Sequence, residues 1–208
     1  NFCNHHAAGQ RQGLLVDLRA AHDPDFLGRS RALQEGHCFG QAGSGLRTRK
    51  DRTRLARQHD IEAAWLLFEA AEIINDQTQM VHFKQLALKM ADAAAIGLAE
   101  NGGLLYEYDG TTNRWIKEYH WWPQAEAMVG FFNAWQLSAK QQYLQQSLNS
   151  WAFVKKYLKD KTNGEWFWGV DENLNPMDEV KAGFWKCPYH NGRACIELIK
   201  RISRTKLC

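Results

Sequence analysis

Three short segments bring histidine, tryptophan and carboxylate side chains to points where a loop should enter a helix. They are residues 59–62 (His-Asp-Ile-Glu), 121–126 (Trp-Trp-Pro-Gln-Ala-Glu) and 185–193 (Trp-Lys-Cys-Pro-Tyr-His-Asn-Gly-Arg). The free N–H groups at a helix start disfavour imidazolium, so a histidine there stays neutral and can act as a base near pH 7. Tryptophan beside such groups is typical of a sugar site, because indole stacks on the apolar face of a sugar ring.

Each segment also has an interpretation that involves no chemistry. His59 and Glu62 lie three residues apart and could be an ordinary side-chain pair on a first turn. The same spacing could ligate a metal, but no second His-rich or Cys-rich motif completes a site, so we expect no metal. Trp122 could belong to a packed corner, and Cys187 beside His190 resembles a Cys/His nucleophile pair only superficially.

Apolar residues at helical spacing predict five helices after residue 57. The first helix should bury Ile61, Trp65 and Phe68 on one face, with Asp60 as a candidate N-cap. Pro123 should occupy the first position of the third helix. The expected ranges are 60–75, 78–100, 124–137, 140–158 and 188–202.

Two of the helices carry more detailed expectations. In the second, Val81 should face inward, and residues 101–103 (Asn-Gly-Gly) should form a left-handed stop at the C-terminus. The fourth should bury one face made of Leu144, Leu148, Trp151 and Val154.

Short strands should connect the helices. Residues 104–108 and 114–116 form a hairpin candidate around Asp109-Gly110, and residues 163–170 form a second small strand-turn element. Antiparallel helices with one broad apolar face each favour all-α packing in pairs over an α/β sheet.

Composition limits the class of protein. With 208 residues, 45% hydrophobic and 24% charged, the chain can form one core-bearing domain, which excludes fully disordered, collagen-like and coiled-coil proteins. No segment approaches the ~18 to 20 consecutive apolar residues of a membrane span, so we expect no membrane association. Five cysteines without a CxxC pair favour reduced thiols, and nothing directs export, so we expect a cytoplasmic location.

The first 57 residues differ from the rest. They carry ten basic residues against five acidic ones, contain no Trp or Tyr, and show no sustained apolar period. A basic arm of this kind could bind nucleic acid, but no aromatic or folded surface accompanies it. We therefore interpret residues 1–57 as a poorly ordered leader, unrelated to the rest or read in a shifted frame, and expect no nucleic-acid partner.

The four strings at residues 59–63, 121–127, 163–168 and 185–193 resemble the N-acylglucosamine 2-epimerase superfamily, most closely its disaccharide (cellobiose) 2-epimerase branch. The resemblance covers residues 58–202. It implies an (α/α)6 barrel whose pocket is lined by loop-to-helix junctions, and residues 58–208 would form its C-terminal half. Family members are much longer, and their N-terminal half supplies an Arg, a Tyr and an Asn/His motif that cannot be placed in this chain. The Gly that commonly precedes the first string is Gln58.

The resemblance also implies roles for individual residues. His59 and His190 correspond to the two general acid/base histidines, and no cofactor is required. Glu62, Trp122 and Trp185 correspond to residues that bind and orient the sugar, and Glu126 belongs to a shared motif without a firm role. The form of the last string favours a β-1,4-linked disaccharide as substrate.

Several functions remain open at this point. The first is an isomerase that inverts C2 of the reducing-end glucose of such a disaccharide. An N-acylglucosamine 2-epimerase or a related monosaccharide isomerase is an alternative within the superfamily. A glycoside hydrolase on the same type of barrel would need two carboxylates around the scissile bond, and only Glu62 and Glu126 lie near the expected junctions. A non-catalytic sugar-binding remnant is the last alternative. The sequence does not determine the oligomeric state.

Overall fold

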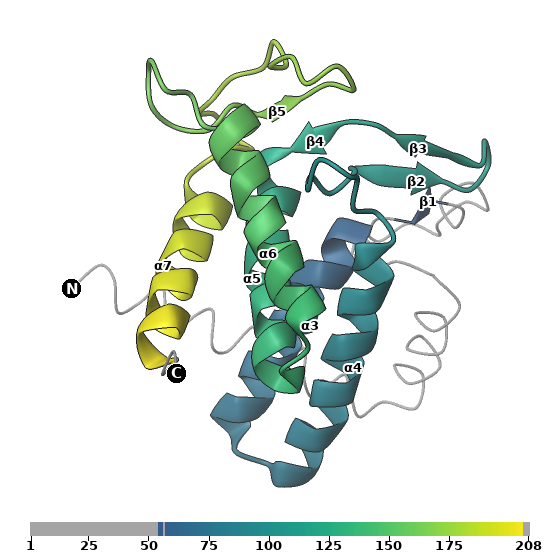
Figure 1. Ribbon diagram of the computed structural model, residues 1–208, viewed down its shortest axis with the longest axis vertical. Coiled ribbons are helices and arrows are strands. Elements are labelled where there is room, and N and C mark those ends of the chain that lie inside the picture. The colour runs from purple at the N-terminus through teal and green to yellow at the C-terminus, as the bar shows by residue number, and fades with distance from the viewer. Residues whose placement is uncertain (1–53, 56, 206–208) are drawn as a thin grey trace.

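Helices in two layers make up most of the molecule, with short strands gathered at one end, as the computed structural model in Figure 1 shows. The structure describes residues 54–55 and 57–205. Helices α3 (Arg57–Ile74) and α4 (Gln77–Ala95) pack together, as do α5 (Trp121–Ser138) and α6 (Gln141–Phe153). Helix α6 continues as a short π-helix, η2 (Val154–Leu158). Both α3 and α7 (Tyr189–Arg204) pack on α5, so α3, α5 and α7 form one layer.

The strands lie at the end where α3, α5 and α7 begin (Figure 1). Strand β1 (Arg54–Leu55) pairs antiparallel with β2 (Glu107–Asp109), which pairs with β3 (Arg114–Ile116). Strand β4 (Tyr119–His120) pairs antiparallel with β5 (Gly169–Val170). Strands occur in both predicted strand-turn regions, although β5 pairs with β4 rather than within residues 163–170. Two antiparallel helix pairs, α3–α4 and α5–α6, with α7 packed on α5, confirm the all-α prediction within the described residues.

Helix α3 buries the face that its apolar spacing predicts. Ile61, Trp65 and Phe68 are all buried. Asp60 is not the N-cap, because the helix begins three residues earlier and places Asp60 in the first turn. Helix α4 does have a side-chain cap, since the Asp76 carboxylate accepts hydrogen bonds from the N–H groups of residues 78 and 79 at 2.9 and 3.1 Å.

Helix α4 differs from its prediction in two respects. Its side chain at Val81 is 60% exposed rather than inward. It also ends at Ala95, before the predicted glycine stop. Gly102 has the expected positive φ, +87°, but it serves the turn that follows, where a Cβ would lie 2.6 Å from the carbonyl oxygen of Asn149.

The buried face of α6 matches the prediction only in part: Val154, where α6 continues into η2, is buried as expected. Leu148 and Trp151 are exposed, whereas Ser147 and Ser150 are buried. The Ser147 hydroxyl donates to the carbonyl of Met128 on α5 at 2.7 Å, and Ser150 donates to the carbonyl of residue 102. Small side chains whose hydroxyls are satisfied in this way let two helices approach closely, so serine replaces leucine in the contact.

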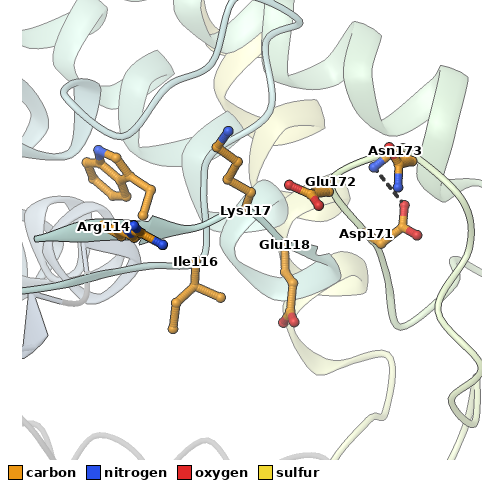
Figure 2. Close-up of a pocket in the computed structure, with 8 residues that line it drawn as sticks. Arg114, Ile116, Lys117, Glu118, Asp171, Glu172 and Asn173 are labelled. Atoms are coloured by element: carbon orange, nitrogen blue, oxygen red, sulfur yellow. Dashed lines mark hydrogen bonds between the residues drawn. The ribbon is translucent and has the colours of Figure 1, made fainter. Parts of the chain in front are cut away.

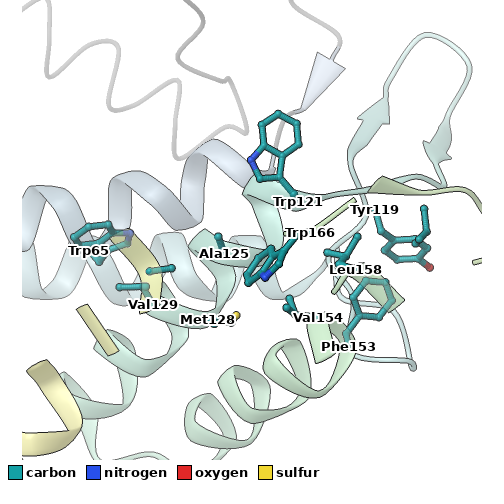
Figure 3. Close-up of a cluster of buried hydrophobic side chains, with 12 residues drawn as sticks. Trp65, Tyr119, Trp121, Ala125, Met128, Val129, Phe153, Val154, Leu158 and Trp166 are labelled. Carbon is teal, nitrogen blue, oxygen red and sulfur yellow. The ribbon is translucent and has the colours of Figure 1, made fainter. Parts of the chain in front are cut away.

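A cluster of large buried side chains fixes the start of α5 (Figure 3). It joins α3, α5, α6, η2 and the β4–β5 region, and α7 adds Ala194. The N–H of Trp121 also donates to the carbonyl of Trp168 at 2.9 Å, and the buried Gln124 amide bonds both the N–H and the carbonyl of Leu104. The first turn of α5 is therefore held by packing and by hydrogen bonds.

Helices α3 and α5 approach each other at a glycine. A Cβ built on Gly130 would lie 2.5 Å from the side chain of Ile61 and 2.7 Å from its carbonyl oxygen. Any larger residue would push α3 away from α5.

No helix among the described residues is long and apolar enough to cross a lipid bilayer. The interpretation of residues 1–57 as a leader falls almost entirely outside the described part of the chain.

Candidate active site

The predicted acid/base residues lie at one end of the layer made of α3, α5 and α7, where these three helices begin. His59 is in the first turn of α3, Trp122 and Glu126 are in the first two turns of α5, and His190 is the second residue of α7. Because α3 and α7 both pack on α5, residues far apart in the sequence become neighbours.

Glu126 is the centre of the group. Its side chain is only 1% exposed, so each carboxylate oxygen needs a partner within the protein. Trp65 Nε1 donates to Oε2 at 2.9 Å, and Arg193 Nη2 donates to Oε1 at 2.6 Å. His190 Nδ1 lies 2.7 Å from the same Oε1. This single carboxylate thus connects α3, α5 and α7.

The bond from His190 to Glu126 defines the tautomer of the imidazole. An ionised carboxylate only accepts hydrogen bonds, so Nδ1 carries the hydrogen. The other ring nitrogen, Nε2, is then the atom that can take or give a proton. Such a carboxylate–imidazole pair is a common arrangement for a histidine that acts as a general base.

Arg193 lies between two carboxylates. Its Nη2 contacts Glu62 Oε1 at 2.9 Å as well as Glu126, and the two carboxylates raise the pKa of the guanidinium in spite of its desolvation. Burial and the nearby Glu126 raise the pKa of Glu62, while the hydrogen bond from Arg193 opposes this shift. Glu62 Oε1 is also 4.0 Å from His190 Nδ1.

Trp122 contacts both histidines. Its ring centroid lies 5.1 Å from that of His59 and 5.5 Å from that of His190. The His59 side chain reaches solvent, yet desolvation by the surrounding protein and, to a lesser degree, the nearby His190 lower its pKa. The prediction that His59 favours the neutral form therefore agrees with the structure, where desolvation and a second imidazole lower its pKa.

Trp185 stands apart from this group. It is 73% exposed, and among the described residues its ring contacts Phe184, 5.1 Å away between centroids, rather than the other predicted site residues. The structure thus brings together five of the six predicted residues.

Two members of the site, Trp65 and Arg193, were not predicted from the sequence. Each lies three residues after a predicted one, Glu62 or His190, and so shares its helical face. The helical spacing could therefore have indicated both, although the spacing of Trp65 also fits a core residue.

A possible metal-binding group appears that the sequence did not indicate. Ligand atoms of Glu62, Glu126 and His190 all lie within 4.8 Å of one another. However, the Arg193 guanidinium already contacts both carboxylates, so a cation would have to displace it. The chemistry of the group is that of an ion-pair network around an imidazole.

A hollow of about 700 Å³ opens at the same end of the molecule (Figure 2). Residues 114–118 form one side and residues 171–173 the other. Its Glu118 carboxylate lies 2.9 Å from Nε2 of His120, the residue before α5. None of the predicted site residues lines this hollow.

Comparison with known proteins gives a consistent result. The model of the N-acylglucosamine 2-epimerase family matches residues 55–194. A cellobiose 2-epimerase from Bacteroides fragilis is 48% identical over 143 residues, which are 68% of this chain and 36% of that protein. A solved sugar epimerase from a ruminal bacterium has a TM-score of 0.68 at 38% identity, covering 71% of this chain and 38% of the other. A solved cellobiose 2-epimerase from Bacillus thermoamylovorans has a TM-score of 0.65 at 35% identity, covering 72% and 38%.

These matches define how much of the fold is present. The chain spans little more than a third of the length of the relatives that it matches. Its helices form part of an (α/α)6 barrel, with α3, α5 and α7 as inner helices and α4 and α6 outside them.

Proposed function

The chain belongs to the N-acylglucosamine 2-epimerase family, and on that premise we propose that it carries the acid/base half of a sugar 2-epimerase. The proposed substrate is a β-1,4-linked disaccharide such as cellobiose, whose reducing-end glucose becomes mannose. Residues 58–208 would be the C-terminal half of the barrel. The observation that supports this most directly is the pair of histidines on Trp122, one of them bonded to the buried Glu126.

The proposed reaction needs no redox change. In the open-chain sugar the C1 aldehyde makes the C2 hydrogen acidic, so a neutral imidazole can remove it as a proton. The electron pair then shifts onto the carbonyl oxygen and gives a planar enediolate. Delivery of a proton to the other face of C2 produces the epimer. Two bases are required because a single fixed group would return the proton to the original face.

Each site residue has a separate role in this reaction. His59 and His190 are the two bases, and the lowered pKa of His59 favours its neutral form as a proton acceptor. Trp122 offers an apolar surface on which a sugar ring can stack. Glu62 and Arg193 present polar groups for sugar hydroxyls, and Glu126 orients His190.

Incubation of the 208-residue chain with cellobiose in heavy water tests the proposal. Epimerisation with deuterium at C2 of the new mannose unit is the expected result. Parallel incubations with mannose and N-acetylglucosamine separate the disaccharide reaction from the monosaccharide alternatives. Binding of cellobiose without turnover would contradict catalysis by this chain and leave a sugar-binding remnant.

Release of glucose in the same experiment would indicate hydrolysis. The geometry does not favour this result. Glu62 and Glu126 share one guanidinium, at 2.9 and 2.6 Å, and Glu126 is almost completely buried. A glycosidase instead needs two carboxyl groups that flank the scissile bond and reach the substrate.

A further inference from the structure

Lys186, immediately after Trp185, has one of the most deeply buried side chains in the molecule. Its side chain is 1% exposed, and its Nζ donates to Glu165 Oε1 at 3.0 Å and to the carbonyl oxygen of Lys181 at 2.8 Å. The ammonium also lies 5.5 Å from the centroid of a Trp121 ring. A buried ammonium is strongly destabilising unless a charge of opposite sign accompanies it. Among the described residues, Glu165 provides that charge.

Glu165 has an unusual backbone conformation. Its φ is +57°, in the left-handed region, and it directly follows Gly164, whose φ is +73°. For a residue with a side chain this conformation costs on the order of 1 kcal/mol, and glycine avoids that cost. A glutamate at such a position indicates that its carboxylate is needed there. The N–H of Trp166 and the ammonium of Lys186 lower the pKa of Glu165 although partial burial opposes them, so the carboxylate is ionised.

The same carboxylate oxygen holds the start of α7. Asn191 Nδ2 donates to Glu165 Oε1 at 2.7 Å, and Asn191 is buried in the first turn of the helix. Its neighbour along the chain is His190. Glu165 therefore holds the turn beside His190, while Glu126 holds the imidazole ring.

We propose that Glu165, together with Lys186, is a positioning pair for His190. The carboxylate fixes the first turn of α7 through Asn191, and the ammonium joins that turn to the start of α5 through its contact with Trp121. Neither residue touches the substrate. This inference rests on the proposed function, since it assigns the pair to the histidine that exchanges a proton there.

Glu165→Gly tests the proposal because it makes the backbone conformation easier while removing the carboxylate. If Glu165 were only a turn residue, this variant would be neutral or more stable. If Glu165 positions His190, the Glu165→Gly variant should have a kcat for cellobiose about 10- to 100-fold lower than the parent, with KM within about threefold. Small displacements of a reacting group are enough to cause such a loss. The ring signals of His190 in NMR spectra should shift and broaden.

Ala139→Gly is the matched control. Ala139 has nearly the same φ, +58°, at the C-terminal end of α5, and its methyl group makes no hydrogen bond. This variant should leave both kcat and the His190 signals unchanged. A loss of the same size in both variants would overturn the proposal.

A double variant, Glu165→Gly with Lys186→Met, separates positioning from stability. It removes the unpaired buried ammonium and should recover thermal stability, and it keeps the test valid if the single variant does not fold. Because Asn191 still lacks the Glu165 carboxylate as its hydrogen-bond acceptor, kcat should stay low and the His190 signals should stay perturbed. Recovery of kcat together with stability would show that the pair is only structural. The His190 NMR signals test the positioning role even if the chain shows no turnover. Failure of the proposed function and failure of this inference can therefore be distinguished.

Discussion

Glu126 Oε1 on α5 lies 2.7 Å from His190 Nδ1 on α7, a contact between residues 64 positions apart in the chain. The carboxylate is almost completely buried, and it also accepts hydrogen bonds from Trp65 and Arg193. The bond from His190 therefore orients an imidazole from inside the protein and leaves its Nε2 as the nitrogen free to exchange a proton. The proposed chemistry depends on this arrangement.

Glu126→Gln should lower kcat for cellobiose by about 10²- to 10³-fold, because a neutral amide neither fixes the tautomer of His190 nor stabilises its cation. The change keeps the size of the side chain, so the effect on KM should be small. Steady-state kinetics measure both. Glu197→Gln, which removes a carboxylate paired with Lys200 and Arg201 further along α7, should have no such effect. A kcat of the Glu126→Gln variant within twofold of the parent value would refute the role of Glu126 in orienting His190.

Gly130→Ala should destabilise the protein by about 1–3 kcal/mol, because its methyl group would collide with Ile61 and separate α3 from α5. Chemical denaturation measures the difference in the free energy of unfolding. Gly192→Ala is the matched control, since its Cβ would lie 3.9 Å from the nearest other side-chain atom, that of Pro188. It should be neutral or stabilising by about 0.5–1 kcal/mol. Equal effects would contradict the close approach at Gly130.

The free energy of unfolding should depend on pH through His59 and His120. Desolvation by burial is the main cause that lowers the pKa of each below 6.5, and for His120 it outweighs the opposing Glu118. As the pH falls below about 6.5, the unfolded chain binds protons that these folded imidazoles do not, so stability decreases. The raised pKa values of Glu62 and Glu69 act in the opposite direction at lower pH.

His120→Gln isolates one part of this dependence. Between pH 8 and the folded-state pKa of His120, the parent should lose more stability than the variant, because only the parent has this imidazole to protonate on unfolding. Denaturation midpoints for both chains across that range provide the measurement. Identical slopes would show that His120 is not desolvated.

The two predicted sugar-binding tryptophans should behave differently. Trp122 contacts both histidines, so Trp122→Ala should weaken cellobiose binding by about tenfold or more and also disturb catalysis. Trp185 is exposed and contacts Phe184, so Trp185→Ala should leave folding stability unchanged and weaken substrate affinity alone. Calorimetric titration with cellobiose separates the two. Unchanged affinity in the Trp185 variant would remove it from the site.

Apolar spacing predicted the five helices, and in α3 it also predicted the buried face of Ile61, Trp65 and Phe68. Helix α5 is instead buried on nearly all sides over residues 123–134. Apolar spacing was wrong at Leu148 and Trp151 of α6, where buried serine hydroxyls satisfied by carbonyl groups on neighbouring segments select a different face. Five of the six predicted site residues lie together, and they were predicted from their types at loop-to-helix junctions and from the family resemblance. Arg193 and Trp65 acquire their roles only when α3 and α7 pack on α5 and meet Glu126, which local sequence does not specify.

Replacing each histidine separately tests the two-base mechanism. His59→Asn and His190→Asn should each abolish net epimerisation of cellobiose, because inversion needs a proton donor on the face opposite the acceptor. The remaining histidine can still remove the C2 proton and return one to the same face. In heavy water, at least one variant should therefore incorporate deuterium at C2 of the glucose unit without forming mannose. Mass spectrometry of recovered cellobiose measures this exchange, and the double variant should show none. Near-normal epimerisation by either single variant would exclude the mechanism, since one base would then serve both faces.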